Sequence, residues 1–176
     1  QHIEMTRDVA SRVHAKIGKE LFVLPEAKIS EATQLIPGTD GEKMSKSKNN
    51  VIDIFLPEKA LRKQIMGIAT DSTPLEAPKD PESCNVFALY RLLAQPNQIE
   101  AMAQNYAQGG YGYGHAKQAL FELIIDKFGP QREAFTQMVY DTKQLDELLA
   151  IGAAKAQKVA SEVIGRVREH LGYWAN

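Results

Sequence analysis

Apolar residues recur every three or four positions over most of the chain, and this spacing limits the fold to packed helices. The clearest stripe lies near the C-terminal end and consists of Ala156, Val159, Ala160, Val163, Val167 and Leu171. A second stripe near the start consists of Met5, Val9, Val13 and Ile17. Gly18 follows that stripe at a position where glycine commonly ends a helix. The pattern therefore predicts a helix at each end of the chain.

Proline and glycine divide the middle of the chain into shorter predicted helices. Pro96 separates two helices that we expect over 85–94 and 97–108. A further helix is predicted over 115–128, and Gly129-Pro130 should end it because proline cannot continue the backbone hydrogen bonding of a helix. Another helix then runs to about residue 140. The prolines within 70–83 favour a stiff, extended connector there.

Two short segments near the N-terminal end are predicted to be extended, 21–24 and about 33–36. They are too short to form a stable sheet alone, so we interpret them as edge pieces of a sheet whose other strands precede Gln1. No cap or linker precedes the first predicted helix, and the chain does not begin with Met. We therefore expect Gln1 to be an interior position of a longer protein. The predicted fold is mainly α, a helical bundle behind the edge of an α/β domain.

Composition excludes several classes of protein and of site. Cys84 is the only cysteine, which rules out an intrachain disulfide and a cysteine-based zinc site, and fits a reducing cytoplasm. The histidines have no ligand-like spacing, so no metal site is expected. No apolar run approaches the ~20 residues that cross a bilayer, so no membrane span is expected. The net charge of −1 means that any nucleic-acid contact must come from local basic clusters.

One polar segment has a composition suited to chemistry, and it follows a dense turn signal at 37–41. Its two ammonium groups lie three residues apart with hydroxyls beside each, so together they can surround a polyphosphate. Gly38 and Gly41 would let such a loop close on a ligand. A solvated surface loop can have the same composition, so the spacing alone does not decide between a phosphate-binding loop and a solvated one. The segment is Lys43-Met44-Ser45-Lys46-Ser47.

These five residues are identical to the KMSKS signature of class I aminoacyl-tRNA synthetases. Residues 1–8 resemble the helix that follows the substrate-binding segment in the tryptophanyl and tyrosyl enzymes. Two further segments, 68–72 and 152–156, are more similar to the tryptophanyl family than to the tyrosyl one. The resemblance runs from Gln1 to about Gly172. Smaller matches are Pro25-Glu26-Ala27 and Tyr111-Gly112. The chain is thus similar to the C-terminal portion of a tryptophanyl-tRNA synthetase.

This resemblance implies an ATP-dependent ligase that activates L-tryptophan and transfers it to tRNA-Trp. It implies a C-terminal part of the Rossmann-like catalytic domain over 1–55 and a helical anticodon-binding domain over 56–176. Lys43 and Lys46 would be the catalytic cations that stabilise the departing pyrophosphate. Ser45 and Ser47 would donate to phosphate oxygens, with Met44 as a packing anchor of the ATP-binding loop and Leu35 and Ile36 beside adenine.

The family's properties also imply partners and limits. Mg²⁺ would accompany ATP, although no carboxylate cluster specifies a protein site for it. Family members are usually cytoplasmic homodimers. Their HIGH-type nucleotide motif and tryptophan pocket lie upstream, so we expect this chain by itself to be inactive in tryptophan-dependent pyrophosphate exchange.

Basic residues on two predicted helices are candidates for tRNA contact. In the last helix they are Lys155, Lys158 and Arg166, and on the helix that begins near Pro57 they are Lys59, Arg62 and Lys63. A solvated helix face is the alternative for both groups. Two other functions stay open as well: a tyrosyl or other class I synthetase, and a non-catalytic helical module that binds tRNA or protein.

Overall fold

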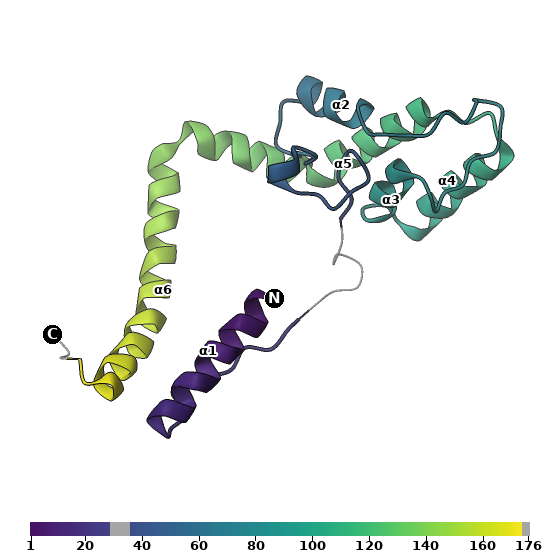
Figure 1. The fold of residues 1–176 in the computed structure, drawn as a ribbon. Helices are drawn as coiled ribbons and strands as arrows, with labels where there is room; N and C mark the ends of the chain where they lie inside the picture. The colour runs from purple at the N-terminus through teal and green to yellow at the C-terminus, as the bar shows by residue number, and fades with distance from the viewer. Residues whose placement is uncertain (29–35, 174–176) are drawn as a thin grey trace. The chain divides into compact units, whose positions relative to one another are not determined.

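The computed structural model describes residues 1–28 and 36–173, and these residues are mainly helical (Figure 1). The prediction of a mainly α fold is confirmed. No strand occurs in the described residues, where extended pairing is limited to an isolated bridge between Pro37 and Lys43. The helices are α1 (His2–Ile17), the 3-10 helix η1 (Lys46–Lys48), α2 (Glu58–Met66), α3 (Asn85–Arg91), α4 (Pro96–Gln108), α5 (Tyr113–Tyr140) and α6 (Thr142–Leu171).

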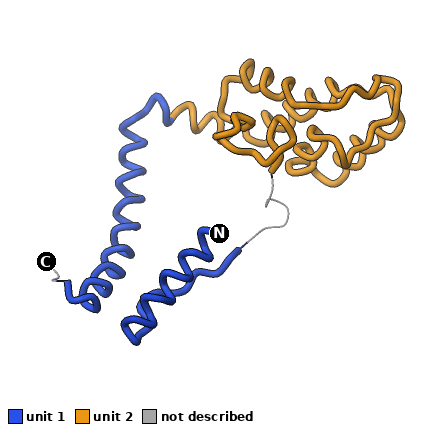
Figure 2. The backbone as a smooth tube through the Cα atoms, in the orientation of Figure 1, with its two compact units in different colours: residues 1–29, 138–176 blue, residues 30–137 orange. Residues whose placement is uncertain are grey.

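The chain divides into two compact units, which Figure 2 shows in different colours. Unit 1 comprises residues 1–29 and 138–176, and unit 2 comprises residues 30–137. The predicted domain division after residue 55 concerns the family's catalytic and anticodon-binding domains, and it stays a prediction.

The hydrophobic core of unit 2 lies where α2, α3, α4 and α5 pack together. Leu61, Ile65 and Ile68 are fully buried, as their helical spacing predicts. Tyr106 of α4 is also fully buried, and its ring lies 5.8 Å from that of Phe87. Each buried side chain of this size stabilises the fold by about 1.5–3 kcal/mol. Unit 2 therefore has a rigid base on which a loop can be held.

The connector between α2 and α3 is non-helical, as its prolines predict, and a buried lysine organises it. The Lys79 ammonium donates to the carbonyl oxygens of Pro74, Leu75 and Ala77 at 3.0, 3.2 and 3.1 Å. The same ammonium lies 5.5 Å from the centre of the Tyr113 ring. Carbonyls and the aromatic face replace the water that a buried charge loses.

The prediction that Gly129-Pro130 ends a helix is wrong, because α5 continues through both residues to Tyr140. Pro130 costs α5 one backbone hydrogen bond, but tertiary contacts hold the helix on either side of it. Phe128 packs against the core before the proline. After it, the Arg132 guanidinium donates to the carbonyls of Ile54 and Leu56, the second at 2.9 Å.

In unit 1, α1 ends as predicted at Gly18, which has a left-handed φ of 72°. The Gly18 N–H donates to the backbone carbonyl of His14 at 2.8 Å. The extended segment predicted at 21–24 is not a strand. Its backbone binds a side chain of α1 instead, since the Phe22 N–H donates to His14 Nε2 at 2.9 Å. The other predicted extended segment lies mostly outside the described residues.

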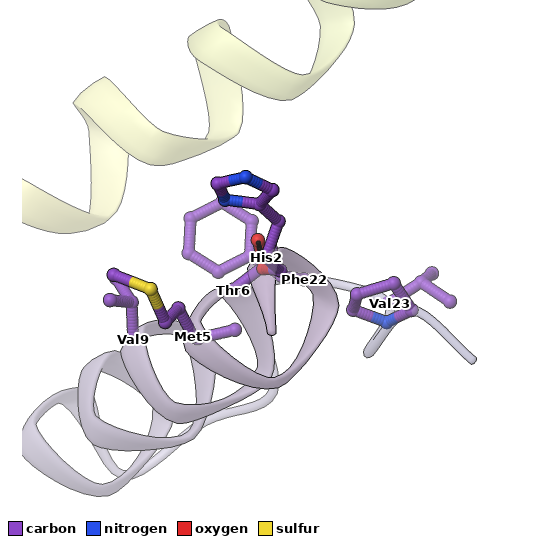
Figure 3. Close-up of a pocket in the computed structure, with 8 residues that line it drawn as sticks. His2, Met5, Thr6, Val9, Phe22 and Val23 are labelled. Atoms are coloured by element: carbon purple, nitrogen blue, oxygen red, sulfur yellow. Dashed lines mark hydrogen bonds between the residues drawn. The ribbon is translucent and has the colours of Figure 1, made fainter. Parts of the chain in front are cut away.

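The apolar stripes that predicted the two terminal helices are largely exposed, which sequence spacing did not indicate. Met5 and Val9 of α1 are 65 % and 63 % exposed, and no described residue of α6 is buried. Met5, Val9, Phe22 and Val23 line an open pocket of about 630 Å³ (Figure 3). None of the described helices is both long and apolar enough to span a membrane.

Candidate functional site

The segment Lys43–Ser47 is carried by a tight turn that two glycines make possible. The Gly38 N–H donates to Glu42 O at 2.7 Å, and the Gly41 N–H donates to Gly38 O at 3.1 Å. Gly41 has a φ of +85°, and a Cβ there would lie 2.6 Å from Asn85 Oδ1. A larger residue at position 41 would therefore meet both backbone strain and the α3 helix.

Asn50 joins the two sides of this turn. It is 2 % exposed, and its Oδ1 accepts from the Ser45 N–H at 2.7 Å. Its Nδ2 donates to Asp40 Oδ1 at 2.7 Å and to Lys43 O at 3.2 Å. Asn49 has a left-handed φ of 54°, which turns the chain after η1 so that Asn50 comes back beneath the loop.

Asp40 is the acidic partner within the turn. Its Oδ1 also accepts from the Glu42 N–H at 3.0 Å. The Asn50 side-chain hydrogen bond is the main cause that lowers the pKa of Asp40, with contributions from the Glu42 backbone and the Lys48 charge. Asp40 therefore acts as an ionised acceptor that holds the turn, at physiological pH, in a single hydrogen-bonded arrangement.

The two lysines of the segment are exposed, and no carboxylate among the described residues lies within 4 Å of either ammonium. The nearby ion pair is made instead by Lys48, whose Nζ lies 3.6 Å from Glu42. The Ser45 and Ser47 hydroxyls are hydrogen-bonded to each other at 2.8 Å. Lys43 and Lys46 thus present mobile positive charge on a fixed base, which suits an anionic ligand.

Met44 attaches the segment to the core of unit 2. Its side chain is half-buried and packs against the core cluster. With Ile52, Leu89 and Leu120 it lines an apolar cavity of about 220 Å³. The prediction that Met44 packs against the body of the protein is confirmed.

Side chains from the helices hold the backbone on both sides of the loop. Gln64 of α2 donates to Val51 O at 2.9 Å and accepts from the Asp53 N–H at 3.0 Å. Asn85 of α3 donates to Ala69 O at 3.1 Å, and the Ala69 N–H donates to Thr39 O at 2.7 Å. The backbone is therefore held by side chains of α2 and α3 on both sides of the loop.

The remaining predicted site residues are distributed as follows. Leu35 lies outside the described residues. Ile36 is described, and its carbonyl accepts from the Met44 N–H at 2.9 Å. Lys155, Lys158 and Arg166 are exposed on α6. In the described part of the chain, no group of three or more histidine, cysteine or acidic side chains is arranged to hold a metal.

Sequence reasoning missed Asn50 and Asp40. Both types of residue are common in turns, so neither stands out in the sequence. The one usable signal was the crowding of glycine, aspartate and asparagine around the lysines, which indicated a turn without indicating which side chain would be buried beneath it.

Comparison with known proteins gives the context for this loop. The family of class I tRNA synthetases (W and Y) matches residues 1–129. The chain is 45 % identical to a tryptophan–tRNA ligase from Rhodopirellula baltica and 44 % identical to one from Campylobacter jejuni, each over 98 % of this chain. It covers 53 % and 54 % of those two proteins, so it spans about half the length of the curated relatives it matches.

Solved structures agree with these relatives. The tryptophanyl-tRNA synthetase of Campylobacter jejuni, complexed with ADP and tryptophan, superposes with a TM-score of 0.82 at 44 % identity. That match covers 97 % of this chain and 53 % of the solved one. The tryptophanyl-tRNA synthetase from Mycoplasma pneumoniae, at 23 % identity and a TM-score of 0.68 over 98 % and 53 % of the two chains, shares the fold.

Proposed function

The chain belongs to the class I tRNA synthetases of the tryptophan and tyrosine type, and on this premise we propose that the product of its gene is a tryptophan–tRNA ligase. The observation that carries the proposal is the exposed Lys43–Ser47 loop, held on a fixed base in a chain 45 % identical to a tryptophan–tRNA ligase. Tryptophan is preferred to tyrosine because the two curated relatives compared above are both tryptophan–tRNA ligases.

The proposed reaction has two steps. The tryptophan carboxylate attacks the α-phosphorus of ATP, the bond from that phosphorus to the bridging oxygen breaks, and pyrophosphate leaves. A ribose hydroxyl at the end of tRNA-Trp then attacks the carbonyl carbon of the adenylate, loses its proton, and AMP leaves. Negative charge builds on the bridging oxygen during the first step, which is where fixed or closing cations lower the barrier.

In this proposal Lys43 and Lys46 supply those cations. Both are exposed and unpaired with carboxylates among the described residues, so they are available to a polyphosphate. An interaction that forms fully only as the loop closes on the departing pyrophosphate raises the rate rather than the affinity for ATP. Ser45 and Ser47 are proposed as donors to phosphate, with Met44 anchoring the ATP-binding loop and Leu35 and Ile36 beside adenine.

The remaining proposed partners are Mg²⁺, tRNA-Trp and a second copy of the gene product. Mg²⁺ is expected to accompany ATP through the phosphate oxygens, and no residue of this chain is assigned to it. The helical region is proposed to bind tRNA-Trp, with Lys155, Lys158 and Arg166 as candidate phosphate contacts. The gene product is proposed to be a cytoplasmic homodimer, because members of this family usually are.

The decisive experiment is amino-acid-dependent exchange of pyrophosphate into ATP, assayed on the purified product of the gene that encodes this chain. We expect exchange with tryptophan and none with tyrosine. Exchange driven by tyrosine would transfer the proposal to the tyrosyl branch of the family. tRNA binding without exchange for any amino acid would favour a non-catalytic binding module instead. Residues 1–176 alone, about half the length of the relatives, are expected to show no exchange.

A further inference from the structure

We propose that Asn50 and Asp40 form a positioning pair that sets the geometry of the Lys43–Ser47 loop for the ATP step. This inference rests on the proposed function, and it adds two residues that do not themselves touch ATP. They would act through the backbone that carries the two lysines.

The contacts of Asn50 are those of a positioning residue. Its amide oxygen holds the Ser45 N–H, and its amide nitrogen holds the Lys43 carbonyl, so one side chain fixes the backbone on both sides of Met44. The backbone carbonyl of Asn50 also accepts from the Thr39 N–H at 2.9 Å. Asn50 thereby contacts the loop at two points and the preceding turn at a third.

Asp40 completes the pair by holding Asn50 in the required orientation. The amide of Asn50 has an oxygen and a nitrogen end, and only one orientation lets the oxygen accept from Ser45. The Asp40 carboxylate, 2.7 Å from Asn50 Nδ2, accepts hydrogen bonds and donates none, so it selects that orientation. The negative charge of Asp40 therefore determines which way the Asn50 side-chain amide is oriented.

Steric limits make asparagine specific at this position. A Cβ on Gly38 would lie 2.4 Å from Asn50 Cγ, so the turn backbone lies directly against the amide. Glutamine would bring an extra methylene into that contact. Aspartate would fit, but it would lose both donated hydrogen bonds and would place a second carboxylate against Asp40.

The pair also determines which groups of the loop are available to phosphate. The Ser45 N–H is taken by Asn50 and the two hydroxyls bind each other, whereas the ammonium groups are exposed. We infer that the backbone from Lys43 to Ser45 keeps this internal geometry during the ATP step, while the lysine and serine side chains of the loop rearrange to meet phosphate. Loss of the pair should therefore reduce kcat for adenylate formation with little change in the KM for tryptophan.

The test uses Asn50→Asp, Asp40→Asn and the exchanged double variant in the product of the gene. Asn50→Asp should lower kcat of tryptophan-dependent exchange by about tenfold to hundredfold. The loss should be smaller at acidic pH, where one proton shared by the two carboxylates restores a hydrogen bond. The double variant exchanges donor and acceptor across the same contact and should recover part of the rate. Asn105→Asp, the same chemical change at an exposed position of α4, is the matched control and should leave kcat unchanged.

A second measurement is independent of ligase activity. In the 176-residue chain, hydrogen exchange of the Ser45 amide should become at least about tenfold faster in Asn50→Ala, which removes the acceptor of that amide, while amides of α4 stay protected. Unchanged protection of Ser45, or a double variant no better than Asn50→Asp at any pH, would overturn the positioning role. If the unsubstituted gene product shows no exchange with tryptophan, the proposed function itself fails and this role fails with it. The Ser45 result then still establishes whether the hydrogen bonds exist.

Discussion

The two units of the molecule use similar helical patterns with opposite results. In unit 2 the periodic residues Leu61, Ile65 and Ile68 are fully buried, and the polar side chains of Asn50 and Gln64 hold the backbone near the loop. In unit 1 no residue of the α6 stripe is buried, and Val159 is 64 % exposed. Amphipathic spacing thus identifies a face that favours burial, but it does not specify what covers that face.

This difference has a functional counterpart. Unit 2 combines a rigid core with an exposed pair of lysines, which is the arrangement expected of a preorganised site. Unit 1 contributes helices whose apolar faces are exposed over much of their length. Four predictions test whether the two units differ in activity, stability and binding as they do in burial.

The largest effect is expected at the loop of unit 2. Replacing Lys43 and Lys46 together by Ala in the gene product should lower the rate of tryptophan-dependent exchange by about a thousandfold, or about 4 kcal/mol of transition-state stabilisation. Pre-steady-state formation of the adenylate measures this directly. Lys48→Ala, which removes a neighbouring cation already paired with Glu42, is the control. An unchanged rate in the double variant would end the proposed role of the loop.

The second effect compares the cores. Leu61→Ala should destabilise unit 2 by about 3 kcal/mol, because it leaves a cavity among fully buried neighbours. Val159→Ala on α6 should change stability by less than about 0.5 kcal/mol, since its side chain is mostly exposed. Urea unfolding of both variants, followed by circular dichroism, measures the contrast. Equal losses would mean that α6 has a covered face in solution.

A smaller effect is expected for tRNA binding by unit 1. Replacing Lys155 and Arg166 by Gln should weaken binding of tRNA-Trp by the gene product by about 1 kcal/mol per lost phosphate contact and flatten its salt dependence. Binding measured over a series of KCl concentrations gives the slope. Lys143→Gln, at an exposed position of α6 that is not among the candidate contacts, tests whether any exposed helical lysine has the same effect. An unchanged slope would remove Lys155 and Arg166 from the interface.

The smallest effect concerns pH and the turn beneath the loop. The pKa of Asp40 is lowered in the folded protein, chiefly by the Asn50 hydrogen bond. The carboxylate therefore stabilises the turn above its unfolded pKa, and this contribution is lost as the pH falls through the lowered folded value. NMR titration of the Asn50 side-chain amide signals should follow that transition. In Asp40→Asn the transition should be absent, and its persistence would assign the titration to another group.

Sequence reasoning succeeded where the cause was local. Gly18 ends α1 because a left-handed residue is needed there and glycine accepts that conformation without strain. The prolines of 70–83 kept that segment out of a helix, as expected. Reasoning failed at Pro130, where a local rule for ending helices was overridden by the contact of Arg132 with Ile54 and Leu56. It also failed at 21–24, where the His14 side chain of α1 binds the backbone and no strand forms.

By itself the sequence determined the helical content, the ends of several helices, and the identity of the segment that carries positive charge and hydroxyls. These features depend on residues a few positions apart, whose backbone preferences and chemistry are fixed by residue type. Only the tertiary structure decided that Asn50 is buried beneath the loop, that α5 passes through Pro130, and which apolar stripes are covered. Such outcomes depend on contacts between distant parts of the chain, and residue type alone does not specify which distant side chain will supply a partner.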